Sequence, residues 1–249
     1  MDRTTEEVLL GRLPGELDAA DGVLVCDIDN GVLTPSLLSE IIRIARSHRN
    51  RSSSIREARR IFSMYRVATV LTPNRFEAQY GTGLDMSAAE NWPAGANKLI
   101  ADLDLSVSLV TLHRDGMFLS EGSGQALHIG TTPREVYDVT GAEDIVLATF
   151  SFFWIARLPA PEAAVLANAA GGLEVARHGA TVISREEPAA ALHIQPGSGR
   201  KIRFLHELCG EVDRAEIVHS IQSDIFVASE RLSGSIGDEF GRFAVMAFA

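Results

Sequence analysis

The segment from Asp138 to Asp144 combines a glycine turn with acidic side chains immediately before a long apolar run. The apolar run, Ile145 to Ala156, predicts a buried helix that begins at this turn. The first backbone N–H groups of a helix have no intrahelical partner, and that end of the helix carries a partial positive charge. Such groups suit a phosphate or a developing anion. An aspartate at Asp144 has the chemistry to take a proton from an attacking hydroxyl group.

Strands and helices alternate along the rest of the chain. Strands are predicted at Gly22–Asp27, Ala68–Leu71 and Ser106–Thr111, with a hairpin from Gly116–Leu119 and Ala126–Ile129. Helices are predicted from Thr34 or Pro35, from about Arg75, after Gly141 and over Pro159–Ala176. The basic, serine-rich stretch His48–Arg60 is interpreted as surface. This alternation is typical of an α/β fold with a largely parallel sheet, in which ligands bind at the carboxyl ends of the strands.

The composition excludes several classes of protein. A formal net charge of −10 argues against nucleic acid as a partner, because phosphate backbones are bound by basic surfaces. Cys26 and Cys209 lie far apart and form neither a metal-binding pattern nor a disulfide framework. The longest apolar run is too short to cross a bilayer, and no signal peptide is apparent. We therefore expect a cytoplasmic protein with no membrane partner.

The segment Asp138 to Asp144 resembles the DxxGAGD signature of the ribokinase-like (PfkB) carbohydrate kinases. The resemblance implies that Asp144 is the catalytic base, and that the backbone amides of Gly141, Ala142, Glu143 and Asp144 form an anion hole. Glu143 stands where this family has its second glycine, and it brings negative charge to the place where the family binds phosphate.

Further segments support the resemblance in the same order along the chain. Over roughly residues 21–187 they look most like the heptose-7-phosphate kinase domain of bifunctional ADP-heptose synthesis enzymes. The resemblance implies a ribokinase-like three-layer sandwich with a mostly parallel central sheet, ATP and Mg²⁺ as cofactors, and a sugar or sugar phosphate as acceptor. Only about twenty residues precede the first predicted strand. We therefore expect a fold truncated at the N-terminus, without the sugar-binding half.

Asn74 and Glu77 match the NxxE motif, which in this family organises Mg²⁺ and its waters near the phosphates. The resemblance thus makes both residues indirect metal contacts, acting through water. An asparagine after a proline is also a common helix cap, and a glutamate in a helix is usually solvated, so a structural role stays open. Thr111 to Gly116 matches the nucleotide loop, with His113 in place of a family glycine.

Two later residues match the wall of the adenine pocket. Asn168 lies where the family lines that pocket, although an amide there can equally serve helix packing. Gly179 has the same assignment, with a simple turn glycine as its alternative. Asn30 stands where the family has a lysine, so a cationic phosphate contact is replaced.

We expect three regions: residues 1–187 as the nucleotide-side portion of a kinase domain, 188–200 as a linker, and 201–249 as a degenerate nucleotidyltransferase-like remnant or appendage. Three functions stay open: an ATP-dependent carbohydrate kinase, a catalytically impaired pseudokinase that binds nucleotide or a partner, and a degenerate product of a bifunctional gene. A homodimer or a partner chain is expected to supply the missing half.

Overall fold

The computed structural model describes residues 3–18, 20, 22–27, 31–47, 52–56, 62–131, 137, 139, 141–177, 183–184, 186–193, 226–228 and 243–247. The chain divides into two compact units. The first holds residues 1–130, 222–229 and 243–249, and the second holds residues 131–221 and 230–242.

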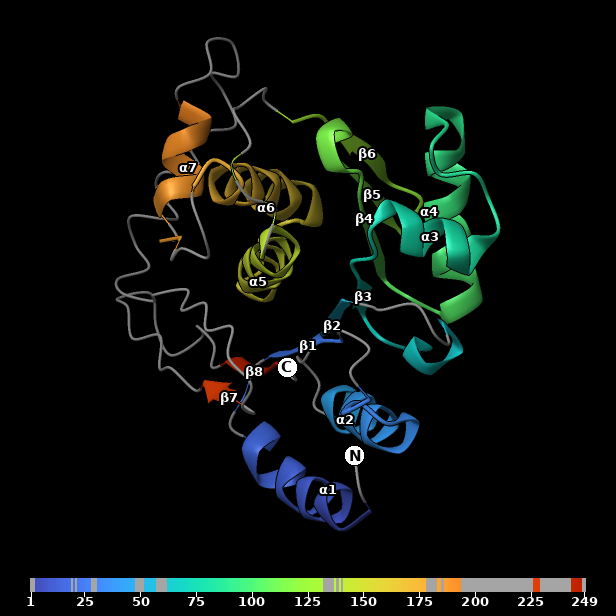
Figure 1. Cartoon of the computed structure of the whole chain (residues 1–249), viewed down its shortest axis with the longest axis vertical. Helices are drawn as coiled ribbons and strands as arrows, with labels where there is room; N and C mark the ends of the chain where they lie inside the picture. Colours follow the sequence, from blue (N-terminus) through green and yellow to red (C-terminus); the bar gives the residue numbers. More distant parts are fainter. Residues whose placement is uncertain are drawn as a thin grey trace. The chain divides into compact units, whose positions relative to one another are not determined.

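The first unit contains one sheet, in which the described residues form eight strands. They are β1 (Gly22–Cys26), β2 (Ser52–Arg56), β3 (Val70–Leu71), β4 (Val107–Thr111), β5 (Met117–Glu121), β6 (Ala126–Ile129), β7 (Phe226–Ala228) and β8 (Phe243–Ala247). Their order across the sheet is β6-β5-β4-β3-β2-β1-β8-β7 (Figure 1). The central strands β4, β3, β2, β1 and β8 run parallel. Strand β5 is antiparallel to β4 and β6, and β7 is antiparallel to β8.

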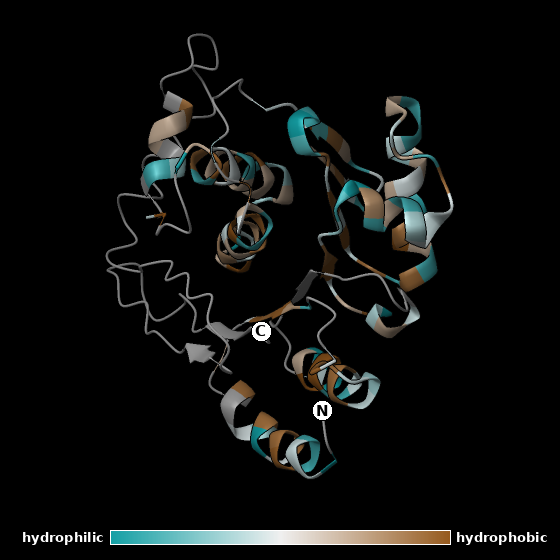
Figure 2. Cartoon of the chain, viewed as in Figure 1, coloured by the Kyte–Doolittle hydropathy of each residue, from teal (hydrophilic) through white to brown (hydrophobic). Residues whose placement is uncertain are grey.

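The helices of the first unit are α1 (Arg3–Asp18), α2 (Pro35–Ser47), α3 (Arg75–Thr82) and α4 (Trp92–Leu103). Helix α2 illustrates why they form. Thr34 precedes it, and its Oγ1 accepts the N–H of Leu37 at 3.1 Å, while Pro35 suits the first helical position. Its leucine and isoleucine residues recur at helical spacing and are buried, which gives the mixed brown and pale turns of α2 in Figure 2.

Strands β4 and β5 form the best-buried part of this unit. All five residues of β4 are buried, and helix α4 packs against both strands. The apolar side chains of α4 that face inward include Ala96, Leu99 and Leu103. This rigid support fixes the end of β4, where a predicted ligand-binding segment begins.

The second unit contains helices α5 (Ala142–Ile155), α6 (Ala160–Glu174) and α7 (Glu186–His193). Helices α5 and α6 pack against each other, and Ile145, Ala170 and Ile183 form a buried apolar cluster. Helix α7 is tied to the segment that follows α6 by an ion pair between Arg177 and Glu187.

Most of the predicted elements are confirmed, including the hairpin and the long helix after Gly141. The interpretation of His48–Arg60 as surface is wrong in part, because Ser52–Arg56 forms β2 between β1 and β3. Helix α7 occupies the beginning of the predicted linker at residues 188–200. Strands β7 and β8 come from the region 201–249, where the sequence predicted no strands. The division into domains at residue 187 stays a prediction.

The α/β class and the mostly parallel central sheet are confirmed. In the part of the chain that the structure describes, none of the helices is both long enough and apolar enough to span a membrane.

Candidate functional site

Helix α3 begins with a reciprocal cap made by Asn74 and Glu77. The Oδ1 atom of Asn74 accepts the backbone N–H groups of Phe76 and Glu77, each at 3.0 Å. In return, a carboxylate oxygen of Glu77 accepts the N–H of Asn74 at 2.7 Å. This is a capping box, which satisfies backbone donors that a helix start leaves without intrahelical partners. Glu77 is buried. The expectation that Asn74 caps the helix is therefore confirmed, whereas the expectation of a solvated Glu77 is wrong, because its carboxylate turns back to the N–H of Asn74.

The cap lies at the carboxyl edge of the parallel strands, beside the end of β4. The N–H of Thr111 donates to the carbonyl oxygen of Pro73 at 2.9 Å, and Asn74 and Thr111 form an isolated parallel bridge. Thr111 is buried. Two segments that the sequence assigned to Mg²⁺ and to the nucleotide are thus joined through their backbones.

A tight turn follows Thr111 and leads into β5. Its Gly116 has φ 88° and ψ −126°, a conformation that residues with a side chain rarely adopt. A Cβ atom at this position would lie 1.9 Å from the carbonyl oxygen of Ile129. Gly116 is therefore required for the close approach of the turn to β6. His113, the residue in place of a family glycine, has φ 53° and packs its ring edge against Phe76 with 5.7 Å between centroids.

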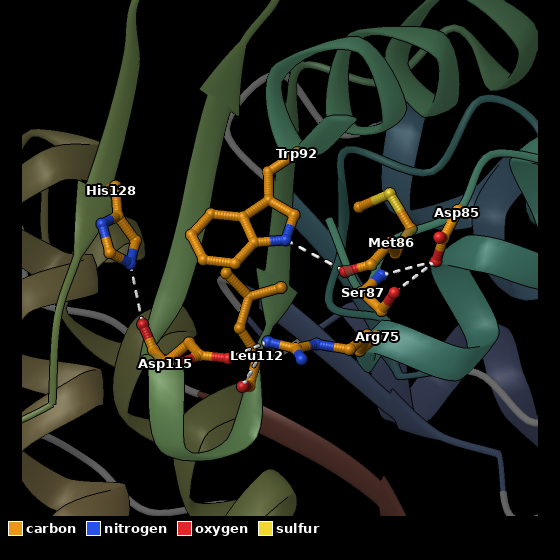
Figure 3. A network of polar contacts seen from close by, with 8 residues as sticks. All are labelled: Arg75, Asp85, Met86, Ser87, Trp92, Leu112, Asp115 and His128. Carbon is orange, nitrogen blue, oxygen red and sulfur yellow. Dashed lines mark hydrogen bonds and ion pairs between the residues drawn. The ribbon is translucent and has the colours of Figure 1, made fainter. Parts of the chain in front are cut away.

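Arg75 joins the cap to the turn, a role that the sequence pattern did not predict. Its Nη2 donates to the carbonyl oxygen of Leu112 at 2.9 Å and also forms an ion pair with the carboxylate of Asp115 (Figure 3). The Arg75 guanidinium holds the pKa of Asp115 below its usual value. An arginine at the start of a helix is normally expected to be exposed to solvent. These contacts could therefore be found only from the fold.

Asp27 occupies the same edge of the sheet, directly after β1. It is 9% exposed, and the hydroxyl group of Tyr65 donates to its carboxylate at 2.6 Å. The sequence indicated only that the first strand ends in an acid. The carboxyl edge therefore presents a buried carboxylate after β1 as well as the capping box after β3.

Helix α5, in the second unit, begins differently. Gly141 has φ 82° and ψ −10°, and glycine brings no side chain to cap the helix. The N–H of Ala142 points to the carbonyl oxygen of Val139 at 3.4 Å. Glu143 and Asp144 both lie in the first turn and are half-buried. The predicted helix start with two acidic side chains is confirmed as geometry, and its chemistry stays a prediction.

The structure brings Asn74, Glu77, Thr111 and Gly116 together in the first unit. It places Gly141 to Asp144 at the start of α5 and Asn168, half-buried, on α6 of the second unit. Gly179 lies outside the described residues, as does Asn30. Among the residues described here, His, Cys, Asp and Glu side chains form no cluster of three or more that could hold a metal ion.

Residues 15–187 match the model of the "pfkB family carbohydrate kinase". The chain belongs to this family. The match covers both the capping box of α3 and the start of α5, so the two candidate regions lie within the pfkB domain. The resemblance that the motifs indicated is thereby confirmed.

Similar proteins agree with membership of the pfkB family. The chain is 37% identical to the "Bifunctional protein HldE" of Trichlorobacter lovleyi over 85% of its own length and 43% of the relative's length. The structure of Arabidopsis thaliana ribokinase complexed with ribose and ATP matches with a TM-score of 0.62 and 19% identity, over 78% of this chain and 60% of that one. Phosphofructokinase-2 from Escherichia coli in complex with potassium matches with a TM-score of 0.63 and 14% identity, over 77% and 60%.

These structures show that the fold is ribokinase-like. The chain spans less than half the length of the HldE relative that it matches.

The donor groups of the capping box suit an indirect role toward Mg²⁺. An amide oxygen has two lone pairs, and Oδ1 of Asn74 already uses both on backbone N–H groups. Its Nδ2 atom can instead donate to a phosphate oxygen. A carboxylate offers about four acceptor positions, so Glu77 can accept hydrogen bonds from water bound to a metal as well as from Asn74. Hard oxygen donors of this kind are those that Mg²⁺ prefers, and Mg²⁺ usually keeps several waters.

Proposed function

We propose that this chain is the nucleotide-side portion of an ATP-dependent carbohydrate kinase, acting on a sugar phosphate of heptose-7-phosphate type. The observation that carries the proposal is the capping box of Asn74 and Glu77. It is bound to the end of β4 at the carboxyl edge of the sheet, inside a pfkB match. Ligands of parallel α/β sheets bind at this edge.

Asp144 is the proposed catalytic base. A carboxylate in the first turn of α5 has the chemistry to accept the proton of the acceptor hydroxyl group. The backbone amides from Gly141 to Asp144 are the proposed anion hole. Glu143 occupies the same turn and adds a second negative charge close to it.

The chain's own residues bind and orient the nucleotide. Glu77 would hold water bound to Mg²⁺, and Asn74 would donate a hydrogen bond to a phosphate oxygen. The Thr111–Gly116 turn would border the nucleotide, and the family resemblance assigns Asn168 and Gly179 to its base. When bound, ATP supplies the transferred phosphoryl group and Mg²⁺ neutralises the charge that develops on it.

The heptose-type acceptor is the finer part of the proposal. It is supported by the similarity to HldE relatives and by the resemblance of residues 21–187 to heptose-7-phosphate kinase domains.

A thermal-shift titration with Mg·ATP and Mg·ADP tests this function. A ligand that binds only the folded protein raises its melting temperature, by an amount equivalent to about 2.7 kcal/mol at a hundred times the dissociation constant. We expect a shift for the wild type, followed by ADP formation when heptose phosphates are added. Glu143→Gly should bind nucleotide more tightly because it restores the family's glycine. Glu162→Gly, at the start of α6, controls for a glycine in a first helical turn.

The outcomes separate the alternatives. A shift in the wild type with turnover supports the kinase. A shift confined to Glu143→Gly contradicts it and indicates that the glutamate closes the anion hole. No shift in either protein contradicts nucleotide binding altogether.

A further inference from the structure

Arg75 occupies an unusual place for an arginine. It is the first residue of α3, where the positive end of the helix dipole disfavours a cation. Its side chain is only 16% exposed. Its Nε atom is buried, with no hydrogen-bond partner among the described residues. Asn74 and Glu77 already cap the helix, so capping does not explain Arg75. A burial this unfavourable must be offset by the remaining contacts of the guanidinium group.

The polar contacts of the Arg75 guanidinium lie at the turn after β4. One nitrogen, Nη2, contacts both the carbonyl oxygen of Leu112 and the carboxylate of Asp115. The guanidinium carbon lies 5.8 Å from the ring centroid of Trp92, which is a cation–π distance. Trp92 is itself fixed, because its indole N–H donates to the carbonyl oxygen of Met86 at 3.0 Å. Figure 3 shows Arg75 reaching from α3 to this turn, alongside the indole ring.

The turn needs such support. Two of its residues, His113 and Gly116, have positive φ values, and for a residue with a side chain this conformation is unfavourable. Inside the turn the N–H of Leu112 donates to Gly116 at 2.7 Å, and the N–H of Asp115 donates to Leu112 at 3.1 Å. The carbonyl oxygen of Leu112 therefore accepts hydrogen bonds both from within the turn and from Arg75.

A second element holds the same turn from β6. The Nε2 atom of His128 lies 2.7 Å from the carbonyl oxygen of Asp115, and its ring lies 4.9 Å from the Trp92 ring. In Figure 3, Asp115 lies between His128 and Arg75. The carbonyl and the carboxylate of one residue are thus bound by two different elements.

We propose that Arg75 is a positioning residue, which sets the Thr111–Gly116 turn at a fixed place relative to Asn74 and Glu77. The inference rests on the proposed function. In that function the phosphates of Mg·ATP contact the turn and the capping box at the same time, so the spacing between these two segments must be fixed. Arg75 acts on the nucleotide through Asp115 and Leu112. Arginine suits this task better than lysine, because its planar guanidinium group also stacks on an aromatic ring such as that of Trp92.

Arg75→Gln in the full chain tests the inference, with Arg43→Gln as the matched control. Arg43 also pairs with a carboxylate, that of Glu40 at 2.6 Å, but on the exposed side of α2. We expect two changes that are specific to Arg75→Gln. Amide hydrogen exchange in the turn, at Asp115 and Gly116, should accelerate about tenfold without ligand, because a charged hydrogen bond is lost. The KM for Mg·ATP should rise about tenfold while kcat falls less.

Asp115→Asn provides a second route, since its carboxylate is 38% exposed and the substitution preserves its shape. It should reproduce both changes in part. The double variant Arg75→Gln with Asp115→Asn should lose less than the sum of the single effects, because the two residues act as one contact.

The results distinguish this inference from the proposed function. If the wild type binds Mg·ATP and Arg75→Gln leaves both turn exchange and KM unchanged, the positioning role is overturned while the kinase stands. If Arg75→Gln and Arg43→Gln raise KM and lower kcat by the same factors, the inference is also overturned, because the effect is then not specific to Arg75. If the wild type binds no nucleotide, the proposed function and this inference fall together.

Discussion

Helices α3 and α5 each begin at a segment that sequence assigns to phosphoryl transfer, yet the two starts are built in opposite ways. The start of α3 is closed by a capping box, and its backbone is tied to β4. The start of α5 is a glycine with a left-handed backbone, which offers no side chain as a cap. The comparison teaches that two motifs of one family can begin a helix either with a side-chain cap or with a glycine that brings none.

The difference has a practical meaning for interpreting substitutions. Side chains in the α3 cap stabilise the helix, so changes there mix stability with function. In α5 the N-cap Gly141 brings no side chain, and the helix is supported mainly by its buried apolar face. Substitutions in this first turn should therefore disturb the helix cap less than substitutions of Asn74 or Glu77.

The largest expected effect is that of Asp144→Asn. A general base typically contributes about 10²–10⁴-fold in rate, so ADP formation with a heptose phosphate should fall by that factor. Nucleotide-induced thermal shifts should stay as in the wild type. Glu162→Gln, an acid in the first turn of α6, is the control and should retain full activity. Unchanged turnover in Asp144→Asn would show that this residue is not the base, and the start of α5 would then have no catalytic role to set against the cap of α3.

Gly116→Ala should destabilise the first unit by at least about 2 kcal/mol, because the new Cβ meets the Ile129 carbonyl oxygen and φ is positive. Gly124→Ala is a matched control, since φ there is 91° but the space is open. Its expected cost is about 1 kcal/mol. Urea unfolding of both variants measures the difference. Equal losses would show that the close approach at Gly116 is unimportant.

Glu77→Gln separates structure from function within α3. Glutamine can keep the hydrogen bond from the N–H of Asn74, so the free energy of unfolding should fall by no more than about 1 kcal/mol. The Mg²⁺ concentration for half-maximal activity should rise roughly tenfold, the effect of one charged hydrogen bond. Glu90→Gln, an exposed acid before α4, should change neither. A stable Glu77→Gln variant with unaltered Mg²⁺ dependence would leave the cap with a structural role alone.

The smallest effect concerns Glu187 in the second unit. The N–H of Ser184 lowers the pKa of Glu187 by donating to its carboxylate, and Arg177 lowers it further, while burial opposes both. Because the folded pKa is depressed, this stabilisation is full above the usual value of about 4.3 and is lost as pH falls through the folded pKa.

Glu187→Gln should therefore melt slightly below the wild type at pH 7, and the gap should close on acidification toward pH 3. Melting curves across that range check the trend, and Arg177→Gln should follow it. A gap that persists or widens in acid would contradict the sign of the pKa shift.

Elements with a strong local pattern could be predicted from sequence. The apolar strand from Gly22, the helix after Asn74 and the long helix after Gly141 all carry such a pattern. Strand β2 could not, because Ser52–Arg56 lacks the apolar residues of a buried strand and owes its place to the flanking strands β1 and β3. Strands β7 and β8 pair with segments remote in sequence, which no local pattern reveals.

In the candidate site, too, the local motifs could be predicted from the sequence, whereas the contacts between distant residues could not. The spacing of Asn74 and Glu77 indicated both a cap and the NxxE motif, and the cap is confirmed. The contact of Arg75 with Asp115 joins residues 40 apart, so it depends on the fold. Gly116 was predicted for a nucleotide loop, and the structure adds a steric reason for it. The roles of Asp144 and Asn168 stay predictions.

The position of strand β8 near the end of the chain has a consequence for the synthesis of the protein. It pairs with β1 along its whole length, from Gly22 with Phe243 to Cys26 with Ala247. During synthesis, the backbone groups on one edge of β1 therefore stay unpaired until β8 is made, some two hundred residues later. At about 5–20 residues per second the wait is roughly ten to forty seconds. An unpaired apolar edge invites pairing with other chains. We therefore expect this edge to be open to aggregation during synthesis, and chaperones that shield β1 in that interval should raise the yield of the protein.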